Sequence, residues 1–484
     1  MQKRVMEKYR AMSPVVKAGL WFTICNFLQK GISFITIPIF TRIMSTEEYG
    51  LYSIYSSWYS ILVIFATLHL SYYVFNKGLV KFEDDRENFV VSIQSLSAAI
   101  TVAFIIVYYI FRKPINGFIG MPTSMIILMM VQILFEPPVL YWTARKRFEY
   151  KYQAVILVTI AISLLNPLIG ILIIKLGVFE NAALARVFSI ALVSLVFGAV
   201  FGLTLARKGE HPFNTKYWRY ALGFNLPLIP HYLSTTILSS ADRIMIGDMV
   251  GNSEAGIYSV AYSIGMVCTL FSQAIQQAYL PWLYKRMKRE EYSGIPEISN
   301  AFLLLMLGIL AMVTCFAPEV VWIVGSSKYM DAIWAIPPIC GSIFFIFLQN
   351  LFANVEYYFE KTKLIAAASV GVALLNMILN YIFIKLSGYL AAGYTTLFCY
   401  IVYSLVHFVV MRRICRQNDL PINNLFDFKA VIGLSILMLG VIAIMLMVYN
   451  YIIIRYAIFL VIMVIAILNR KKIINMVRSI RSNG

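Results

Sequence analysis

The sequence predicts an all-α polytopic membrane protein with fourteen transmembrane helices, arranged as two parallel six-helix repeats and an extra C-terminal helix pair. Its composition, the distribution of its basic residues and an internal repeat predict this fold class. Hydrophobic residues make up 60% of the chain and charged residues 13%, with a mean hydropathy of +0.77. A soluble globular chain is about 45–50% apolar and about 25% charged, so this chain has too few charges to cover a water-facing surface.

The apolar segments are long enough to cross a membrane, because a helix needs about 20 apolar residues to span about 30 Å of hydrocarbon. The first segment contains Asn26, Gln29 and Lys30 and has no small-residue cleavage site after it, so we expect a retained span rather than a signal peptide. The fourteen predicted spans are residues 18–41, 49–76, 88–111, 121–143, 153–174, 182–205, 220–242, 255–283, 298–324, 331–354, 363–384, 388–411, 429–449 and 451–468.

The basic residues predict the orientation. Most of the 41 Lys and Arg residues lie in the N-terminal segment, in every second loop after it and in the C-terminal tail. Because cytoplasmic loops carry an excess of Lys and Arg, this alternation predicts that both termini are cytoplasmic. The net charge of +18 then indicates contact with anionic membrane lipids, and no nucleic-acid-binding motif occurs in the chain.

The two halves of the chain share short motifs in the same order. Residues 41–44 (TRIM) match 242–245 (DRIM), and residues 50–56 (GLYSIYS) match 256–263 (GIYSVAYS). The offset stays at about 200 to 210 residues, which predicts two six-span copies in the same orientation with a substrate site between them. The predicted parts are an N-terminal lobe (1–210), a C-terminal lobe (211–416), and an appended pair of spans with a basic cytoplasmic tail (417–484).

The stretch DRIMIG at 242–247, followed by GIYS at 256–259, together with the twelve-plus-two layout, resembles the polysaccharide-biosynthesis flippases. These Wzx-like proteins, of the O-antigen and capsule type, belong to the multidrug/oligosaccharidyl-lipid/polysaccharide exporter superfamily. The resemblance implies a protein of the bacterial cytoplasmic membrane. It implies that an undecaprenyl-pyrophosphate-linked oligosaccharide moves from the inner to the outer leaflet by alternating access, with polysaccharide assembly machinery as a further partner.

Polar side chains inside the spans are candidates for the substrate cavity, because such groups are expensive in hydrocarbon and usually face a cavity. Lys30, Asn26 and Gln29 fall on one helix face, and the repeat places His231 at the position equivalent to Lys30. These residues and Arg186 suit a cavity that holds an anion. The alternative is that Lys30 and Arg186 extend to the membrane interface or pair with a carboxylate.

Three carboxylates are candidates for ion pairing or for coupling to H⁺ or Na⁺: Glu136 inside a span, Asp242 at the end of one, and Glu356 near the inner end of the span 331–354. Arg42 and Arg243 end the first span of each lobe at its outer face, where they could form an outer gate. The alternative is that each arginine only stabilises the C-terminus of its helix.

The remaining features indicate a transporter and no enzyme. No G-x-x-x-x-G-K-[ST] loop occurs, and we expect no cofactor. The six cysteines are scattered, so we expect neither a disulfide framework nor a metal site. The lone histidines His69 and His407 are interpreted as packing residues.

Moving one negative charge outward across an inside-negative membrane releases about 2.3 kcal/mol per 100 mV, which favours export of an anionic head group without ATP. The alternatives are a cation-coupled drug or metabolite antiporter of the same superfamily and a membrane polysaccharide polymerase.

Overall fold

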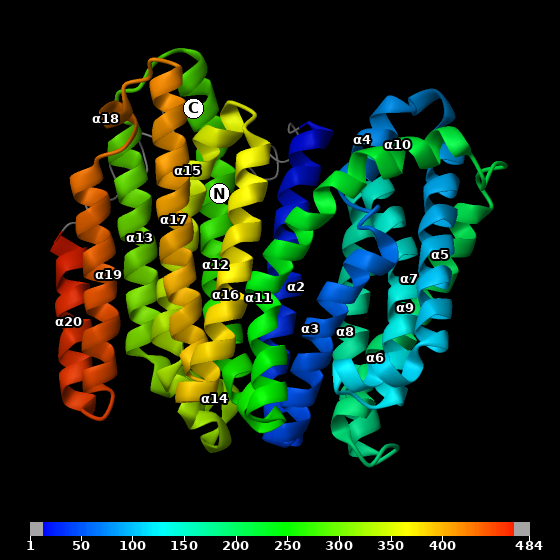
Figure 1. Ribbon diagram of the computed structural model, residues 1–484, viewed down its shortest axis with the longest axis horizontal. Coiled ribbons are helices and arrows are strands. Elements are labelled where there is room, and N and C mark those ends of the chain that lie inside the picture. Colours follow the sequence, from blue (N-terminus) through cyan, green and yellow to red (C-terminus); the bar gives the residue numbers. More distant parts are fainter. Residues whose placement is uncertain (1–12, 469–484) are drawn as a thin grey trace, which may run out of the picture. The chain divides into compact units, whose positions relative to one another are not determined.

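The computed structural model describes residues 13–468, and every regular element in that range is helical (Figure 1). Contacts group the chain into two compact units, Met1–Ser240 and Ala241–Gly484. The basic N-terminal segment before residue 13 and the basic tail after residue 468, both predicted to be cytoplasmic, lie outside the described residues. The all-α class is confirmed.

The helices of the first unit alternate long and short segments, and the last of them crosses the division between the units. They are α2 (Pro14–Ile43), α3 (Thr46–Thr67), α4 (Tyr73–Lys81), α5 (Arg86–Ile110), α6 (Arg112–Ile119), α7 (Thr123–Phe148), α8 (Tyr152–Lys175), α9 (Ala182–Ala206), α10 (Thr215–Asn225) and α11 (Ile229–Met249), with short 3₁₀ helices η1 (Glu83–Asp85) and η2 (Leu226–Leu228).

The second unit continues with long helices and contains one longer 3₁₀ segment. Its elements are α12 (Asn252–Lys288), α13 (Ile295–Cys315), α14 (Ala317–Gly325), η3 (Ser327–Trp334), α15 (Ile336–Tyr358), α16 (Thr362–Ser387), α17 (Ala391–Gln417), α18 (Ile422–Leu425), α19 (Phe428–Val448) and α20 (Ile452–Leu468).

Among residues 13–468, eleven helices are long and apolar enough to cross a membrane, against fourteen expected spans. The other three expected segments are helical but do not meet that standard: 49–76, 220–242 and 451–468. The first two are interrupted helices, and the third is α20, a helix of 17 residues. Eleven of the fourteen expected spans thus coincide with helices that are long and apolar enough to cross a membrane, and the multi-pass character is confirmed. The full number of fourteen spans stays a prediction.

Two further predicted boundaries are wrong. The span expected at 298–324 ends at Cys315, and α14 starts anew at Ala317 with Pro318 in its first turn. A proline has no backbone N–H to continue the preceding helix, so it favours a new helix start. The span expected from residue 331 begins only at Ile336, after η3.

Side-chain caps fix where the helices of the first unit begin. The Ser45 hydroxyl accepts from the Glu48 N–H (3.1 Å), and the Glu48 carboxylate accepts from the Ser45 N–H (2.8 Å), a reciprocal capping box at the start of α3. The other Glu48 oxygen accepts from the Ala182 N–H of α9 (2.8 Å), where Asn181 is the cap. One carboxylate thus stabilises two helix N-termini.

Close helix packing organises the core of the first unit. A Cβ atom on Gly198 of α9 would lie 1.9 Å from the backbone oxygen of Phe135 in α7, so only glycine permits this approach. Beside it, a cluster of buried aromatic side chains includes Phe75, Phe89 and Tyr141. These contacts join α4, α5, α7 and α9 into one body.

The turn between α7 and α8 is held by ion pairs outside the apolar spans. Burial of the Glu149 carboxyl opposes its ionisation, but hydrogen bonds from Lys146, Lys151 and Arg145 outweigh burial and lower its pKa to about 2. Arg145 also forms an ion pair with Glu87 at the start of α5. The ion pairs of Arg145 therefore link the α7–α8 turn to the start of α5.

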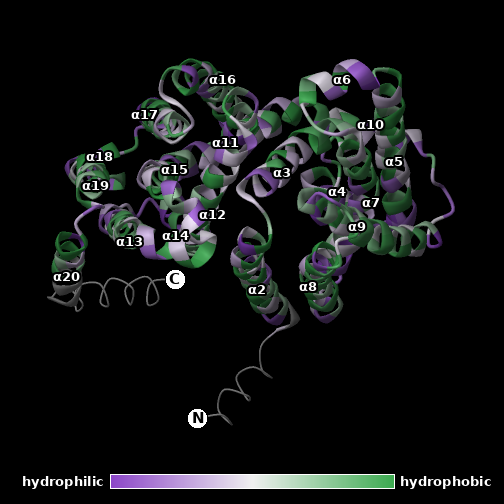
Figure 2. Ribbon diagram, turned by 90° about the horizontal axis from the view of Figure 1, so that it is seen from below, coloured by the Kyte–Doolittle hydropathy of each residue, from purple (hydrophilic) through white to green (hydrophobic). Residues whose placement is uncertain are grey.

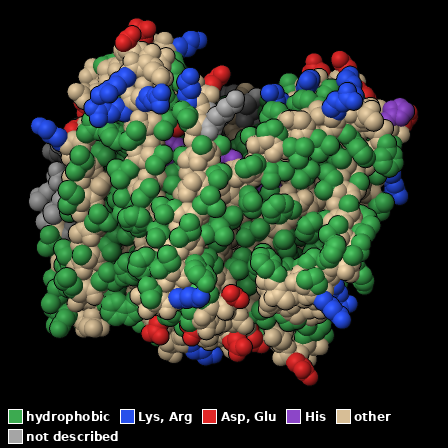
Figure 3. All heavy atoms as spheres, viewed as in Figure 1, with side chains coloured by type: hydrophobic (Ala, Val, Ile, Leu, Met, Phe, Trp, Pro, Cys, Tyr) green, Lys and Arg blue, Asp and Glu red, His purple; other side chains and the backbone are tan. Residues whose placement is uncertain are grey.

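In the second unit, α15 is the central helix and is almost entirely buried. It packs against α12, α13, α17 and α19, which surround it when the helices are viewed end-on (Figure 2). Elsewhere, hydrophobic side chains cover the middle of the helices, and charged side chains gather at the helix ends (Figure 3). This distribution is the one expected for helices that face hydrocarbon.

Candidate functional site

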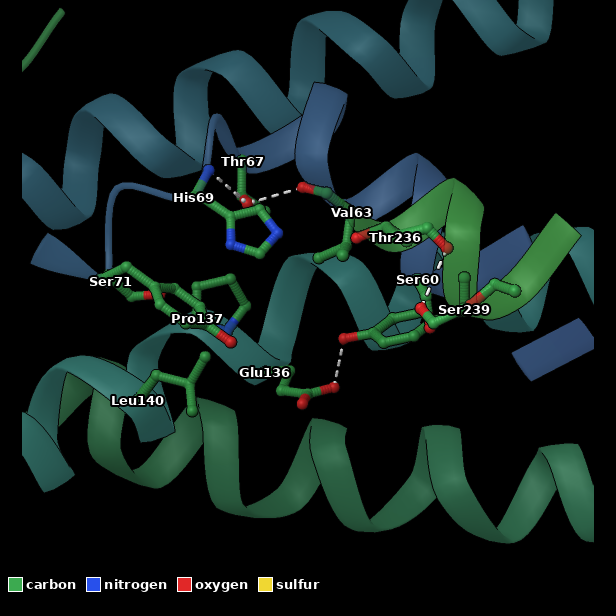
Figure 4. Close-up of a pocket in the computed structure, with 13 residues that line it drawn as sticks. Ser60, Val63, Thr67, His69, Ser71, Glu136, Pro137, Leu140, Thr236 and Ser239 are labelled. Atoms are coloured by element: carbon green, nitrogen blue, oxygen red, sulfur yellow. Dashed lines mark hydrogen bonds between the residues drawn. The ribbon is translucent and has the colours of Figure 1, made fainter. Parts of the chain in front are cut away.

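The first unit contains a polar cavity of about 320 Å³. It lies where α3 ends, beside the middle of α7 and the first half of α11 (Figure 4). Among the described residues, its lining is rich in hydroxyl groups and includes one carboxylate, one imidazole and no Lys or Arg. The lining residues are Tyr59, Ser60, Val63, Thr67, His69, Ser71, Tyr72, Glu136, Pro137, Leu140, Thr236, Ser239 and Ser240.

A helix break forms one side of the cavity. After α3 ends at Thr67, Leu68 and His69 adopt left-handed backbone conformations (φ 48° and 50°), and α4 begins only at Tyr73. The Thr67 hydroxyl accepts from the His69 N–H (3.2 Å) and donates to the Val63 carbonyl (2.7 Å). Non-glycine residues rarely adopt this conformation, and such strain is concentrated at functional sites.

A second interruption contacts the first. Helix α10 ends at Asn225, and η2 with Pro227 separates it from α11. The fully buried Asn225 amide donates to the Leu68 carbonyl, a backbone group left open by the break in α3. Non-helical backbone at membrane depth is tolerated where it is buried in protein or lines a water-filled cavity, and broken helices commonly form transporter binding sites.

Glu136 reaches the cavity from α7 and is held by a ladder of polar side chains. Its Oε2 atom accepts from the Tyr59 hydroxyl and from the Gln132 amide (3.0 Å), while the Gln132 carbonyl oxygen accepts from the buried Tyr55 hydroxyl (2.8 Å). Tyr55 and Tyr59 are one turn apart on α3, as Gln132 and Glu136 are on α7, so both pairs face each other. Figure 4 shows Glu136 hydrogen-bonded across the cavity wall.

Glu136 lies about 20 Å along α7 from its start, at about 1.5 Å per residue. The helix continues through Pro137 and Pro138 to Phe148, so the proline pair does not end it. The position is the middle of α7, a helix long and apolar enough to cross a membrane, and a carboxylate inside such a helix indicates a functional site.

His69 lies at the break and lines the cavity, although its sequence context indicated a packing residue. Its ring lies 4.6 Å from the Tyr72 ring and 5.3 Å from the Tyr232 ring, centroid to centroid. Its Nε2 atom is buried and has no hydrogen-bond partner within residues 13–468. A buried polar atom of this kind is exceptional. No sequence signal marked His69, because the helix break that exposes it to the cavity is not visible in the hydropathy pattern.

The residues predicted to form an anion-binding cavity lie elsewhere in the structure. Lys30, Asn26 and Gln29 are exposed on α2, and His231 is half-buried in α11. None of them lines the cavity described above, and their role stays a prediction.

Arg186 is buried within the first unit. Its guanidinium donates to the Asn166 side-chain oxygen (2.5 Å) and the Ser189 hydroxyl (3.2 Å), and it lies 4.4 Å from the centroid of the Phe40 ring. These hydrogen bonds all start at Nη1, whereas the buried Nε atom has no hydrogen-bond partner among the described residues.

Asp242 is buried in the second unit among neutral donors. Its carboxylate accepts from the Tyr258 hydroxyl (2.8 Å), the Asn380 amide (2.7 Å) and the Thr396 hydroxyl (3.0 Å). The next residue, Arg243, places its guanidinium 4.4 Å from the centroid of the Tyr262 ring. The three donors come from α12, α16 and α17, so this carboxylate ties four helices together.

The third predicted carboxylate, Glu356, forms a pair with His407 that the sequence did not reveal. The two side chains are fully buried, and Glu356 Oε1 lies 2.7 Å from His407 Nδ1. At the remaining predicted site, the outer gate, the Arg42 guanidinium donates to the Pro38 carbonyl of its own helix (2.8 Å). Across residues 13–468, no group of three or more His, Cys, Asp and Glu side chains is placed to hold a metal ion.

Comparison with known proteins agrees with this architecture. The family described as "Polysaccharide biosynthesis protein" matches residues 15–287. A Haemophilus influenzae relative, Lsg locus putative protein 1, is 30% identical over 159 residues, which cover 31% of this chain and 38% of the relative. The chain thus matches little more than a third of that relative's length. Probable low-salt glycan biosynthesis flippase Agl15 of Haloferax volcanii is 21% identical over 81% of this chain and 82% of its own.

Among solved structures, the lipid II flippase MurJ in an inward closed conformation has a similar fold, with a TM-score of 0.70 at 14% identity. The likeness covers 94% of this chain and 100% of that one. At this identity the likeness concerns the fold alone.

Proposed function

The chain belongs to the polysaccharide biosynthesis protein family and is a membrane transporter rather than an enzyme, and from this premise we propose that it flips a lipid-linked oligosaccharide between the membrane leaflets. The carrier lipid is undecaprenyl pyrophosphate, and the glycan moves from the inner to the outer leaflet of the bacterial cytoplasmic membrane. One relative in the comparison is named as a probable glycan biosynthesis flippase, which supports this substrate class.

The observation that carries the proposal is the polar cavity at the break of α3. A hydroxyl-rich cavity beside the middle of α7 is unfavourable in a purely structural helix bundle, because each polar group there costs free energy. It supports a passage for a hydrophilic group, while the polyprenyl tail stays in lipid. The proposed mechanism is alternating access between an N-terminal lobe (1–210) and a C-terminal lobe (211–416), with the appended segment 417–484 beside them.

In the proposed topology the chain crosses the membrane fourteen times and both termini are cytoplasmic. The interrupted segments 49–76 and 220–242 then count as spans whose polar breaks are sheltered by protein. The excess of Lys and Arg in every second loop supports this orientation. The orientation places these basic loops against anionic lipids of the inner leaflet.

The pyrophosphate is proposed to bind at the exposed face of α2 that carries Lys30, Asn26 and Gln29, because a cation lowers the cost of an anion in the membrane. Outward movement of two negative charges gains roughly twice 2.3 kcal/mol per 100 mV of inside-negative potential. Asp242, Glu136 and Glu356 are the candidates for coupling to H⁺ or Na⁺, and Arg42 and Arg243 for an outer gate.

A deletion strain tests the proposal. We expect loss of surface glycan and accumulation of the lipid-linked glycan in the inner leaflet, both restored by the wild-type gene. Lys30→Ala should reduce restoration at least tenfold at normal protein abundance, whereas Lys175→Ala, which removes an exposed lysine from the end of α8, should restore fully. Normal surface glycan in the deletion strain, with new sensitivity to cationic drugs, would identify a drug exporter instead.

A further inference from the structure

We propose that the cavity at the α3 break binds one uncharged sugar unit of the transported glycan, and that the Glu136 carboxylate excludes acidic sugars from it. This inference rests on the proposed function and narrows its substrate class. It assigns the sugar and the pyrophosphate to different places, because the lining that residues 13–468 provide contains a carboxylate and no Lys or Arg.

The size of the cavity favours a small organic ligand over a bare ion. Its volume of about 320 Å³ equals that of about ten water molecules at about 30 Å³ each. It falls at the lower end of the range for small-molecule pockets, about 300–1,000 Å³. A dehydrated cation instead requires several oxygen ligands that converge at about 2.0–2.6 Å.

The lining matches the hydrogen-bonding chemistry of a sugar. Eight of the thirteen lining residues carry a hydroxyl group, which both donates and accepts hydrogen bonds, as the hydroxyl groups of a sugar do. Tyr59 and Gln132 both donate to Oε2 of Glu136, and Oε1 accepts no hydrogen bond from the described part of the chain. That oxygen is available to accept from a ligand hydroxyl.

Aromatic rings complete the match. The Tyr72 and His69 rings line the cavity and contact each other, with Tyr232 behind them. Sugar rings have apolar C–H faces that pack against such rings, while the polar edge of an aromatic residue stays hydrogen-bonded. Val63, Pro137 and Leu140 supply the remaining apolar contacts.

Charge decides which sugars fit. A uronic acid would place its carboxylate in the same cavity as Glu136, where the two negative charges repel each other. A neutral sugar of the same ring size instead gains the hydrogen bond to Oε1. The cavity should therefore prefer neutral to acidic sugars by at least tenfold.

The test uses the full-length protein in lipid nanodiscs, because glycoside detergents would themselves present a sugar. Saturation-transfer NMR compares methyl β-glucoside with methyl β-glucuronide, which differ only in that the hydroxymethyl group of the glucoside is replaced by a carboxylate in the glucuronide. We expect the wild type to bind the glucoside at least tenfold more tightly, and Glu136→Gln to reduce this preference to threefold or less. Glu47→Gln, at an exposed position of α3, should keep the wild-type preference.

A second variant tests the site without altering its charge. Thr236→Val replaces one lining hydroxyl by a methyl group of similar size and should weaken glucoside binding severalfold while the preference over glucuronide stays. Equal binding of both sugars by the wild type, or a preference that Glu136→Gln leaves unchanged, would overturn the inference. So would the absence of binding by the glucoside and by its galactoside, mannoside and N-acetylglucosaminide counterparts.

The two proposals fail in different ways. If the protein restores surface glycan in the deletion strain but binds none of these neutral sugars, the proposed function stands and the sugar site is refuted. If the protein binds the glucoside with the expected preference but does not restore surface glycan, the sugar site stands and the proposed function is refuted. If Glu136→Gln abolishes only a Na⁺ or pH dependence of transport and leaves sugar binding unchanged, Glu136 is a coupling residue and the inference is wrong.

Discussion

An ion pair that attaches α20 to the rest of the second unit allows a quantitative prediction. Both guanidinium NH₂ groups of Arg455 in α20 bind the Glu319 carboxylate of α14 at 2.5 Å, and the Tyr456 hydroxyl donates to the same carboxylate (2.8 Å). Arg455 is 2% exposed, and its guanidinium also donates to the Cys315 carbonyl (2.9 Å). Glu319→Gln would therefore leave a buried guanidinium without its counter-ion.

Breaking a buried pair by removing one partner costs about 3–5 kcal/mol. The Glu319 side chain is 31% exposed, so water compensates part of the loss and the lower end, about 3 kcal/mol, applies. For a unit of this size, 1 kcal/mol shifts the melting temperature by about 2–4 °C. We therefore expect Glu319→Gln to lower the apparent Tm of the purified protein by about 6–12 °C in a thermal unfolding assay.

A double-mutant cycle separates the pair from other effects. The double variant Glu319→Gln/Arg455→Met should be more stable than Glu319→Gln alone, because it contains no uncompensated buried charge. Glu297→Gln, an exposed carboxylate in the first turn of α13, serves as the matched control and should cost less than about 1 kcal/mol. The reasoning is refuted if Glu319→Gln and Glu297→Gln melt within about 1 °C of each other.

Two further predictions concern the first unit. Gly198→Ala should destabilise the protein by about 1–3 kcal/mol or more, because the added Cβ would lie 1.9 Å from the Phe135 carbonyl oxygen. Gly433→Ala is the control, because a Cβ at that position would have no neighbour within 4 Å. Equal melting temperatures of the two variants would contradict the close packing of α9 on α7. Because the folded-state pKa of Glu149 is lowered to about 2, its contribution to stability is complete above the usual carboxyl pKa of about 4.3 and decreases as the pH falls from there toward 2. Glu149→Gln should thus flatten the Tm–pH curve between about pH 5 and pH 3, and a curve as steep as that of the wild type would refute this.

The sequence by itself determined the class of the protein and the approximate positions of its helices. Both depend on local composition, because every membrane-spanning segment must satisfy its own backbone hydrogen bonds and cover the hydrocarbon thickness with apolar side chains. The same reasoning identified Glu136, Asp242 and Glu356 as candidates. A carboxylate in or next to an apolar segment can be recognised in the sequence without knowing which residues it contacts.

The tertiary structure alone decided what these carboxylates contact and where the cavity lies. Glu136 meets Tyr59 across 77 residues, Asp242 meets Asn380 across 138, and Glu356 meets His407 across 51. Such pairings depend on which helix faces are adjacent, which no local pattern specifies. The break at residues 68 and 69 is of the same kind, because its left-handed backbone and the open Leu68 carbonyl are stabilised by contacts such as that from Asn225, 157 residues away.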